Sequence, residues 1–175
     1  MKRIFFAIPF EDDVKAVLST AQKSVMHQAK SGKFHDKENF HLTIKFLGMV
    51  DDDLVEPLWL AVVEAVKDMS GFTITLDRIG SFQKKSKCIP WVGIEPSEAL
   101  NVLHERIRCA VESILQTVEE QAYTPHITLG RQVVIDGLPA FKEKCQVQVK
   151  SLALMESSSE TGVLRYTPLY IKSLD

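Results

Sequence analysis

Two segments of this chain share one short pattern, and no other feature of the sequence constrains the fold as much. Residues 41–44 read His-Leu-Thr-Ile, and residues 126–129 read His-Ile-Thr-Leu. The alternation of polar and apolar residues is typical of a half-buried β-strand. Because successive side chains of a strand point to opposite faces, the His and the Thr of each segment share one face. Imidazole and hydroxyl groups in a core would all need hydrogen-bond partners, so we expect both polar faces to line a cleft that holds an anion.

The residue types on these two faces suit acid–base chemistry on a phosphate. His41 and His126 are the candidate catalytic pair, because histidine is the side chain that titrates near neutral pH without being perturbed. Thr43 and Thr128 can donate hydrogen bonds to the non-bridging oxygens of a phosphate as negative charge grows in the transition state. Arg131 follows the second segment closely, and its guanidinium can grip two phosphate oxygens at once.

Other readings of these residues stay open. The two histidines could be ordinary strand residues whose hydrogen bonds are satisfied. A catalytic zinc would need about three protein ligands, and no third ligand stands at a matching spacing, so we expect neither a metal nor a cofactor. Strict alternation places Lys45 on the same face as His41 and Thr43. We expect the remaining three histidines to be structural or solvated: His27 and His35 in solvent, and His104 at the edge of the core.

Composition limits the function classes. At 175 residues and 45% apolar residues, the chain is long enough and apolar enough to bury a core. A formal net charge of −2 lacks the global basic field of a protein that coats duplex nucleic acid, so an RNA would be bound at a small feature such as a terminus. The three cysteines are odd in number and widely spaced, without CxxC or CxxH spacing, which argues against a disulfide framework or structural zinc. No apolar run approaches 18 residues. We therefore expect a cytoplasmic protein without membrane contact.

The order of predicted elements indicates an α+β fold. Helices are expected from residues 12–13 onward, after the acidic triplet 51–53, and over about 97–118. Loops are expected at 30–39, around the lysines 84, 85 and 87, and in the serine-rich segment 157–162. Strands are expected at 3–8, 41–48, 72–77, 89–94, 126–129, 145–156 and 166–173. A strand, a helix and a His-Thr strand can be traced in both halves, which suggests a diverged duplication with a pseudo-twofold relation between the two histidines.

The two motifs also carry a family resemblance. Residues 41–48 (HLTIKFLG) and 123–131 (YTPHITLGR) resemble the paired signatures of the two-histidine (2H) phosphoesterases. Among these, the sequence is most similar to the bacterial and archaeal RNA 2',3'-cyclic phosphodiesterases, first described as 2'-5' RNA ligases. The likeness extends to residues 3–8, to residues 90–93 and to the last strand. It implies one domain over residues 1–175, made of two closely packed lobes with mostly antiparallel sheets, helices outside and a central cleft.

The resemblance further implies metal-independent opening of a 2',3'-cyclic phosphate to a 2'-phosphomonoester. In that scheme His41 and His126 are the acid–base pair, Thr43 and Thr128 hold the phosphate, and Arg131 matches a basic residue often found after the second motif. By family analogy, His41 protonates the departing 3'-oxygen and His126 activates water. The expected partners are RNA 3' ends or nucleotides bearing a 2',3'-cyclic phosphate, with no membrane, no obligatory protein partner and a monomeric state.

Three other functions remain compatible with the same motifs. Related proteins act on 2'-5' oligoadenylates or on ADP-ribose cyclic phosphate, so the chain could be a 2'-5' oligonucleotide phosphodiesterase. ATP-independent RNA ligation could occur only as the reverse of ring opening, because the chain lacks the Lys-x-Asp-Gly motif of an ATP-dependent ligase. A non-catalytic module that binds RNA ends would need the same cleft.

Overall fold

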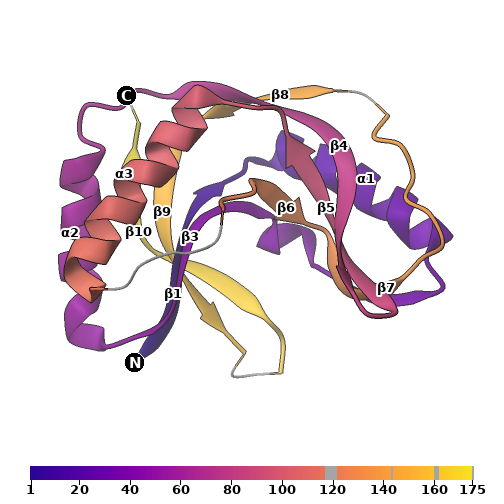
Figure 1. The fold of residues 1–175 in the computed structure, drawn as a ribbon, viewed down its shortest axis with the longest axis horizontal. Helices are drawn as coiled ribbons and strands as arrows, with labels where there is room; N and C mark the ends of the chain where they lie inside the picture. Colours follow the sequence, from indigo (N-terminus) through magenta and orange to yellow (C-terminus); the bar gives the residue numbers. More distant parts are fainter. Residues whose placement is uncertain (117–121, 143, 160–161, 175) are drawn as a thin grey trace.

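The computed structural model describes residues 1–116, 122–142, 144–159 and 162–174. This part of the chain forms two antiparallel sheets and three α-helices (Figure 1). The first sheet has four strands in the order β10-β9-β1-β3. Its strands are β1 (Lys2–Pro9), β3 (His41–Val50), β9 (Ser151–Ser158) and β10 (Arg165–Ser173).

The second sheet has six strands and carries the second His-Thr motif. Its order is β2-β7-β5-β4-β8, and the short strand β6 pairs with β5 beside β7. Its strands are β2 (Ser31–Phe34), β4 (Phe72–Lys84), β5 (Lys87–Ile94), β6 (His126–Thr128), β7 (Gly130–Val134) and β8 (Cys145–Val149). The first motif, in β3, therefore lies in one sheet and the second, in β6, lies in the other.

The helices form the outer layers. They are α1 (Asp12–Gln28), α2 (Asp52–Ala65) and α3 (Glu98–Leu115). α2 and α3 lie side by side over the four-stranded sheet, whereas α1 packs against β5 of the six-stranded sheet (Figure 1). α3 crosses over to the other sheet. The strands before and after it, β5 and β6, belong to the six-stranded sheet, but the helix packs on α2 and on β3 of the four-stranded sheet. No helix in the described residues combines the length and the apolar character that crossing a bilayer requires.

The larger of two clusters of buried apolar side chains among the described residues joins these layers. It contains Leu18 of α1, Leu58 of α2, Leu103 of α3, Leu42 of β3 and Val92 of β5. Each helix contributes buried residues at the spacing of one helical face. The α+β class, the antiparallel sheets and the outer helices are thus confirmed.

Several predicted boundaries are wrong in detail. The predicted loop at 30–39 contains strand β2 and a one-turn 3-10 helix, η1 (Lys37–Asn39), and strand β7 was not predicted. β2 is exposed and polar, so it lacks the alternation by which a strand is recognised, and it exists through pairing with β7. The predicted strand at 145–156 is two strands in different sheets, divided at Lys150, whose carbonyl accepts a hydrogen bond from Leu174.

Three other boundaries also differ. β4 and β5 extend well beyond the core as a hairpin, so the predicted lysine loop shrinks to the turn at residues 85–86. α3 ends at Leu115, where Gln116 adopts a left-handed conformation with φ of 53°; the predicted helix end at residues 117–118 lies outside the described residues. Of the serine-rich loop, residues 157–158 belong to β9, and residues 160–161 are outside the described part.

Candidate active site

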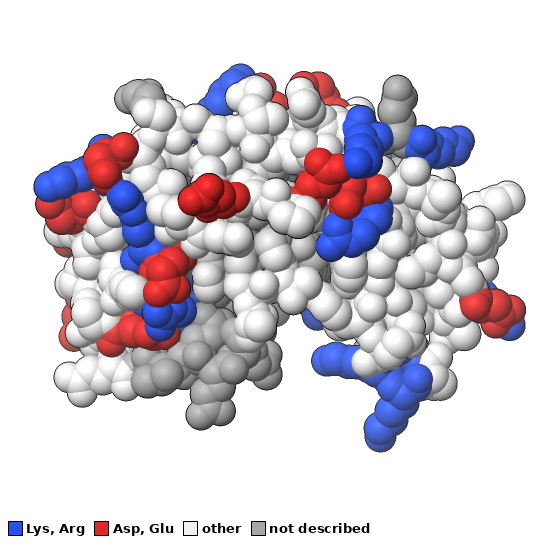
Figure 2. Space-filling model, turned by 45° about the horizontal axis from the view of Figure 1, so that its top comes forward, with Lys and Arg blue, Asp and Glu red and all other residues white. Residues whose placement is uncertain are grey.

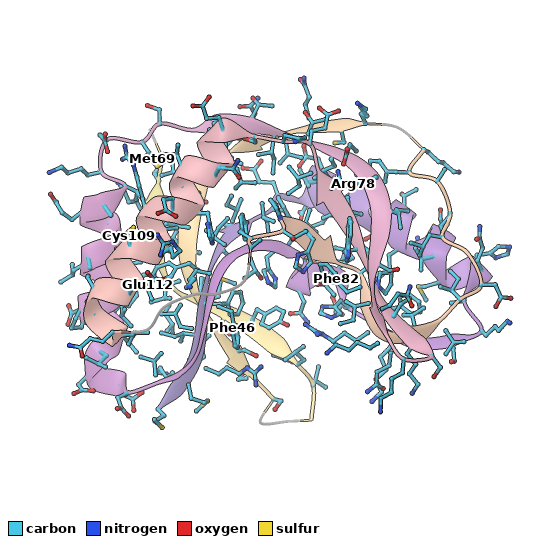
Figure 3. All side chains as sticks on the ribbon, in the orientation of Figure 1. Phe46, Met69, Arg78, Phe82, Cys109 and Glu112 are labelled. Atoms are coloured by element: carbon cyan, nitrogen blue, oxygen red, sulfur yellow. The ribbon has the colours of Figure 1, made fainter. Side chains whose placement is uncertain are left out.

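A cleft of about 490 Å³ lies between the two sheets, and both His-Thr motifs open into it. Fourteen described residues line it: Arg3, Phe5, His35, Asn39, His41, Thr43, Phe46, His126, Thr128, Arg131, Ser157, Ser159, Leu164 and Tyr166. All five residues predicted for the site are among them. Figure 3 labels two phenylalanines that help to locate the cleft. Phe46 of β3 lines it, and Phe82 of β4 packs against His126.

The ring of His41 is held at the first residue of β3 by a backbone carbonyl. The Nδ1 atom lies 2.8 Å from the carbonyl oxygen of Asn39. A carbonyl can only accept, so Nδ1 carries the proton and the neutral ring keeps its lone pair on Nε2. The hydroxyl of Thr43 lies 2.9 Å from that Nε2 and can donate to it. The rings of Phe5 and Tyr166 pack against the imidazole, each with centroids 4.8 Å away.

His126 repeats this arrangement in the other sheet. Its Nδ1 donates to the carbonyl of Thr124, two residues earlier, over 2.7 Å. The ring of Phe82 meets the imidazole edge-on with centroids 4.8 Å apart. Both histidines therefore present Nε2, rather than Nδ1, as the nitrogen available for chemistry.

The surroundings favour the neutral form of both rings in the free protein. Burial lowers the pKa of His41 to about 4, and the charges of His35, His126 and Arg131 add to this effect. The hydrogen bond to Asn39 acts in the opposite direction. Burial, followed by the charge of Arg131, also lowers the pKa of His126. At neutral pH each ring can thus accept a proton from a group bound in the cleft.

The charge of the cleft suits an anion. Arg131, on β7, and Arg3, on β1, both line it, and no Asp or Glu does so among the described residues. The guanidinium of Arg3 stacks over the ring of Phe46 at 5.0 Å, which keeps its charge at the cleft edge. A cleft lined by one sign of charge raises the local concentration of oppositely charged ligands.

Lys45 does not join the cleft, contrary to the prediction from strict alternation. In the β1–β3 ladder Thr43 pairs with Ala7 and Lys45 pairs with Phe6, so Ile44 is an extra residue that forms a bulge. A bulge shifts the following side chains to the opposite face. Lys45 consequently lies on the core side and is 8% exposed, and Phe46 takes the cleft side.

His35 is a cleft residue that sequence reasoning missed. It was expected in solvent, but burial, followed by the charge of Arg131, lowers its pKa to about 4. Its backbone N–H donates to the carbonyl of Leu129 over 3.1 Å. The side-chain amide of Gln22 donates to the carbonyls of His35 and Leu129, each over 2.8 Å. These contacts depend on the unpredicted β2–β7 pairing, so no local signal in residues 30–39 could have revealed them.

Two further histidines and two aromatic residues lie outside the cleft. His104 is buried and stacks on Tyr123 with ring centroids 4.0 Å apart, which fits its expected place at the core edge. The hydroxyl of Tyr123, in the segment before β6, donates to the carbonyl of Thr43 over 3.0 Å and so ties that segment to β3. Trp91 lies behind His126 with ring centroids 6.4 Å apart. His27 is exposed at the end of α1, as predicted.

The polar groups of the cleft are better arranged for proton transfer than for holding a metal. Within the described ranges, no three His, Cys, Asp or Glu side chains gather as a metal-binding group, even though three histidines line the cleft. The two Nε2 atoms, the threonine hydroxyls and Arg131 together suit proton transfer at a bound phosphate. The expectation that no metal or cofactor takes part stays a prediction.

Comparisons with known proteins agree with this geometry. The sequence model of the 2'-5' RNA ligase superfamily matches residues 10–161. A relative from Thermotoga maritima named RNA 2',3'-cyclic phosphodiesterase is 31% identical over 130 residues, which are 74% of this chain and 69% of the relative.

Solved structures with the same fold cover nearly the whole chain. The crystal structure of TT0787 of Thermus thermophilus matches with a TM-score of 0.87 at 24% identity, over 98% of this chain and 97% of that one, and shows the fold alone. The crystal structure of E. coli LigT complexed with 3'-AMP matches with a TM-score of 0.86 at 27% identity, over 99% and 98% of the two chains. From the family match, these likenesses and the two motifs, the chain belongs to the 2'-5' RNA ligase superfamily of 2H phosphoesterases.

Proposed function

We propose that this chain hydrolyses 2',3'-cyclic phosphates on RNA 3' ends or on nucleotides and leaves 2'-phosphomonoesters. One observation carries the proposal: two histidines from different sheets present Nε2 to one cleft that also holds two threonines and an arginine. The relative from Thermotoga maritima has the corresponding name, and the LigT structure holds a nucleotide. Both facts support a nucleotide phosphodiester as the substrate.

The phosphate is held by hydroxyl and guanidinium donors. We assign the non-bridging oxygens to Thr43, Thr128 and Arg131, which approach the cleft from β3, β6 and β7. The transition state carries more negative charge on these oxygens than the bound diester does. Donors that are already in place therefore stabilise the transition state more than the substrate.

The two histidines then move protons in opposite directions. The Nε2 atom of His126 takes a proton from a water molecule, whose oxygen forms the new bond to phosphorus. The bond from phosphorus to the 3'-oxygen breaks, and the protonated Nε2 of His41 delivers a proton to that oxygen. The 2'-ester bond stays intact, so the product is a 2'-phosphate.

His41 must be protonated before it can act as the acid. Its pKa of about 4 in the free cleft disfavours this form at neutral pH. A phosphate anion bound beside the ring stabilises the imidazolium and raises the pKa. Binding of the substrate therefore favours the protonated form of His41 that the reaction requires.

The same proposal extends to the domain organisation, the oligomeric state and the cellular location of the protein. We assign residues 1–175 to one domain, supported by the apolar cluster that joins both sheets, and we propose that this domain works as a monomer. We also place it in the cytoplasm, where thiols stay reduced, because Cys88, Cys109 and Cys145 are all free.

The test is product analysis in the presence of a chelator. Purified protein in EDTA should convert a 2',3'-cyclic nucleotide to the 2'-monophosphate alone, followed by chromatography against both monophosphate standards. A 3'-phosphate product would refute the assigned leaving group. Loss of turnover that returns when a divalent metal is added would refute the metal-independent scheme.

A further inference from the structure

The end of the β4–β5 hairpin carries a group of cations beside the cleft that the proposed chemistry does not use. Lys84, Lys85 and Lys87 are exposed there, and Arg131 and Lys33 lie on the neighbouring strands β7 and β2. We call these five residues the cationic stripe, because β2, β7, β5 and β4 are consecutive strands of one sheet. In Figure 2 the hairpin end lies at the lower right, where blue side chains project without red ones among them.

The stripe contains like charges placed directly opposite each other. Lys84 pairs with Lys87 across the hairpin, and Lys33 pairs with Arg131 across β2 and β7. Directly opposite residues of antiparallel strands share a face, and like charges in such positions destabilise the sheet. A bound anion would remove this repulsion.

No carboxylate of the described residues offsets these charges. None of the five cations forms an ion pair there, whereas most other basic side chains do, for example Lys15 with Glu38 and Lys150 with Glu11. The whole chain has a formal net charge of −2, so the stripe is a local feature rather than part of a basic surface. Unpaired cations gathered at one place are the electrostatic footprint of a polyanion site.

The stripe is continuous with the active site. Arg131 lines the catalytic cleft and also a neighbouring hollow of about 330 Å³, whose other lining residues include Lys84 and Lys87. No Asp or Glu lines this hollow among the described residues. A ligand that leaves the cleft past Arg131 therefore meets the lysines next.

We infer that the cationic stripe binds the backbone phosphates of a single RNA strand whose 3' end occupies the cleft, so that this protein acts on oligonucleotides better than on mononucleotides. The inference rests on the proposed function and names the substrate class. A 2',3'-cyclic phosphate can only be the 3' end of a strand, so the rest of the RNA must leave the cleft on its 5' side. A cleft of about 490 Å³ holds one small ligand, and the adjoining nucleotides must lie on the surface next to it.

The experiment compares substrates of different length. The hairpin variant is Lys84→Gln, Lys85→Gln, Lys87→Gln, and the control variant is Lys23→Gln, Lys67→Gln, Lys150→Gln. The control removes the same charge from exposed lysines that line neither the cleft nor the hollow. The substrates are a 2',3'-cyclic mononucleotide and RNAs of three and ten nucleotides that end in the same cyclic phosphate.

The hairpin variant should lose about tenfold or more in kcat/KM on the ten-nucleotide RNA at low salt, and should keep the mononucleotide rate within about twofold. Each phosphate contact on a single strand contributes a slope of about −0.7 to log affinity against log salt, so three lost contacts should flatten the slope for the long RNA by about 2. The control variant should match the wild type. Equal rates and salt slopes for hairpin variant and wild type on the long RNA would overturn the inference, as would equal losses on RNA and mononucleotide.

A binding measurement separates this inference from the proposed hydrolysis. Fluorescence anisotropy with a labelled ten-nucleotide RNA that ends in a 2'-phosphate requires no turnover. The hairpin variant should bind this RNA more weakly than the control variant does, even if the wild type hydrolyses no cyclic phosphate. Equal affinity of the two variants would refute the stripe as an RNA site, whatever the enzyme assay shows.

Discussion

At the scale of single residues, two backbone carbonyls decide which nitrogens of the site can react. The carbonyls of Asn39 and Thr124 each accept from Nδ1 of the histidine two residues later, so Nε2 is the nitrogen that carries the lone pair in both neutral rings. The sequence predicted both histidines and their threonines because an alternating strand reveals its faces. It could not reveal His35, whose place depends on pairing between strands distant in sequence.

Removing either catalytic imidazole should abolish most of the activity. We expect His41→Ala and His126→Ala each to lower kcat by about 10²–10⁴-fold, the usual contribution of a general acid or base. The assay is hydrolysis of a 2',3'-cyclic nucleotide, with far-UV circular dichroism to verify folding. His27→Ala, at an exposed histidine on α1, should leave the rate unchanged. A His41 or His126 variant that turns over at the wild-type rate would remove that residue from the mechanism.

The pH dependence of kcat/KM should differ from that of kcat. The pKa values of His41 and His126 are lowered in the free protein, so kcat/KM should decline as pH rises above the lowered values and the general acid loses its proton. Bound phosphate raises these pKa values, and kcat reports the complex, so its bell-shaped profile should have a maximum at higher pH. Steady-state kinetics from about pH 4.5 to about pH 8.5 measure both. If kcat/KM and kcat had their maxima at the same pH, the bound substrate would not raise the pKa values of the two histidines.

Stability should fall as the partly buried His35 and His41 become protonated. The pKa values of His35 and His41 are lowered from 6.5 to about 4, so between those values the unfolded chain binds more protons than the folded one. The free energy of unfolding should therefore decrease as pH falls from 6.5 to about 4. Urea denaturation at about pH 7 and about pH 4.5 measures the loss. His35→Gln should reduce the pH dependence, and a variant that keeps the full wild-type dependence would contradict the lowered pKa of His35.

At the scale of elements, irregularities in the strands shape the cleft. The bulge at Ile44 turns Lys45 toward the core and gives its cleft position to Phe46. Residues 41–48 read as a plain alternating strand, so the sequence predicted the strand and its first cleft residues but not the change of face. The exposed strand β2 escaped prediction for a related reason, because its pairing with β7 leaves no local pattern. β7 is short and has two exposed residues between the buried Gly130 and Val133, so it shows no alternation.

A close approach between β4 and β5 places the ring of Trp91 over Gly80. The two residues pair across the strands, and a Cβ on Gly80 would lie 2.2 Å from a ring carbon of Trp91. Gly80→Ala should therefore lower the free energy of unfolding by about 1–3 kcal/mol, the usual effect of overpacking. Because Trp91 packs near His126, hydrolysis should also slow.

Urea denaturation and the cyclic-nucleotide assay measure the two effects of Gly80→Ala. Gly137→Ala is the matched control, because a Cβ there meets no atom within 4 Å, and its stability should stay within about 0.5 kcal/mol of the wild type. If Gly80→Ala were as stable and active as the control, the ring of Trp91 would not be fixed over the strand.

At the scale of the whole molecule, both sheets share their apolar core. The order of elements along the sequence predicted an α+β protein, and the family resemblance implied its two lobes. It did not predict which helix covers which sheet, since the apolar face of α3 fits either sheet equally well by periodicity. Only packing against α2 and β3 settles the assignment.

The shared core predicts that the whole chain unfolds in one transition. Trp59 lies on α2 above the four-stranded sheet, where it stacks on Tyr170, and Trp91 lies in the six-stranded sheet. These are the two tryptophans of the chain, so Trp91→Phe and Trp59→Phe leave one reporter in each half. Within each variant, urea transitions by fluorescence and by far-UV circular dichroism should coincide. Separate midpoints would instead indicate two independently folding units.

The crossover of α3 has a mechanical consequence. The strand before the helix, β5, and the strand after it, β6, which carries His126, both belong to the six-stranded sheet, whereas α3 itself packs on α2 and β3 beside the four-stranded sheet. Swinging the two sheets apart about a hinge would peel α3 away from α2 and expose the apolar side chains between them. α3 therefore ties together the two sheets that carry His41 and His126, and we expect the cleft between them to keep the same width with and without a ligand.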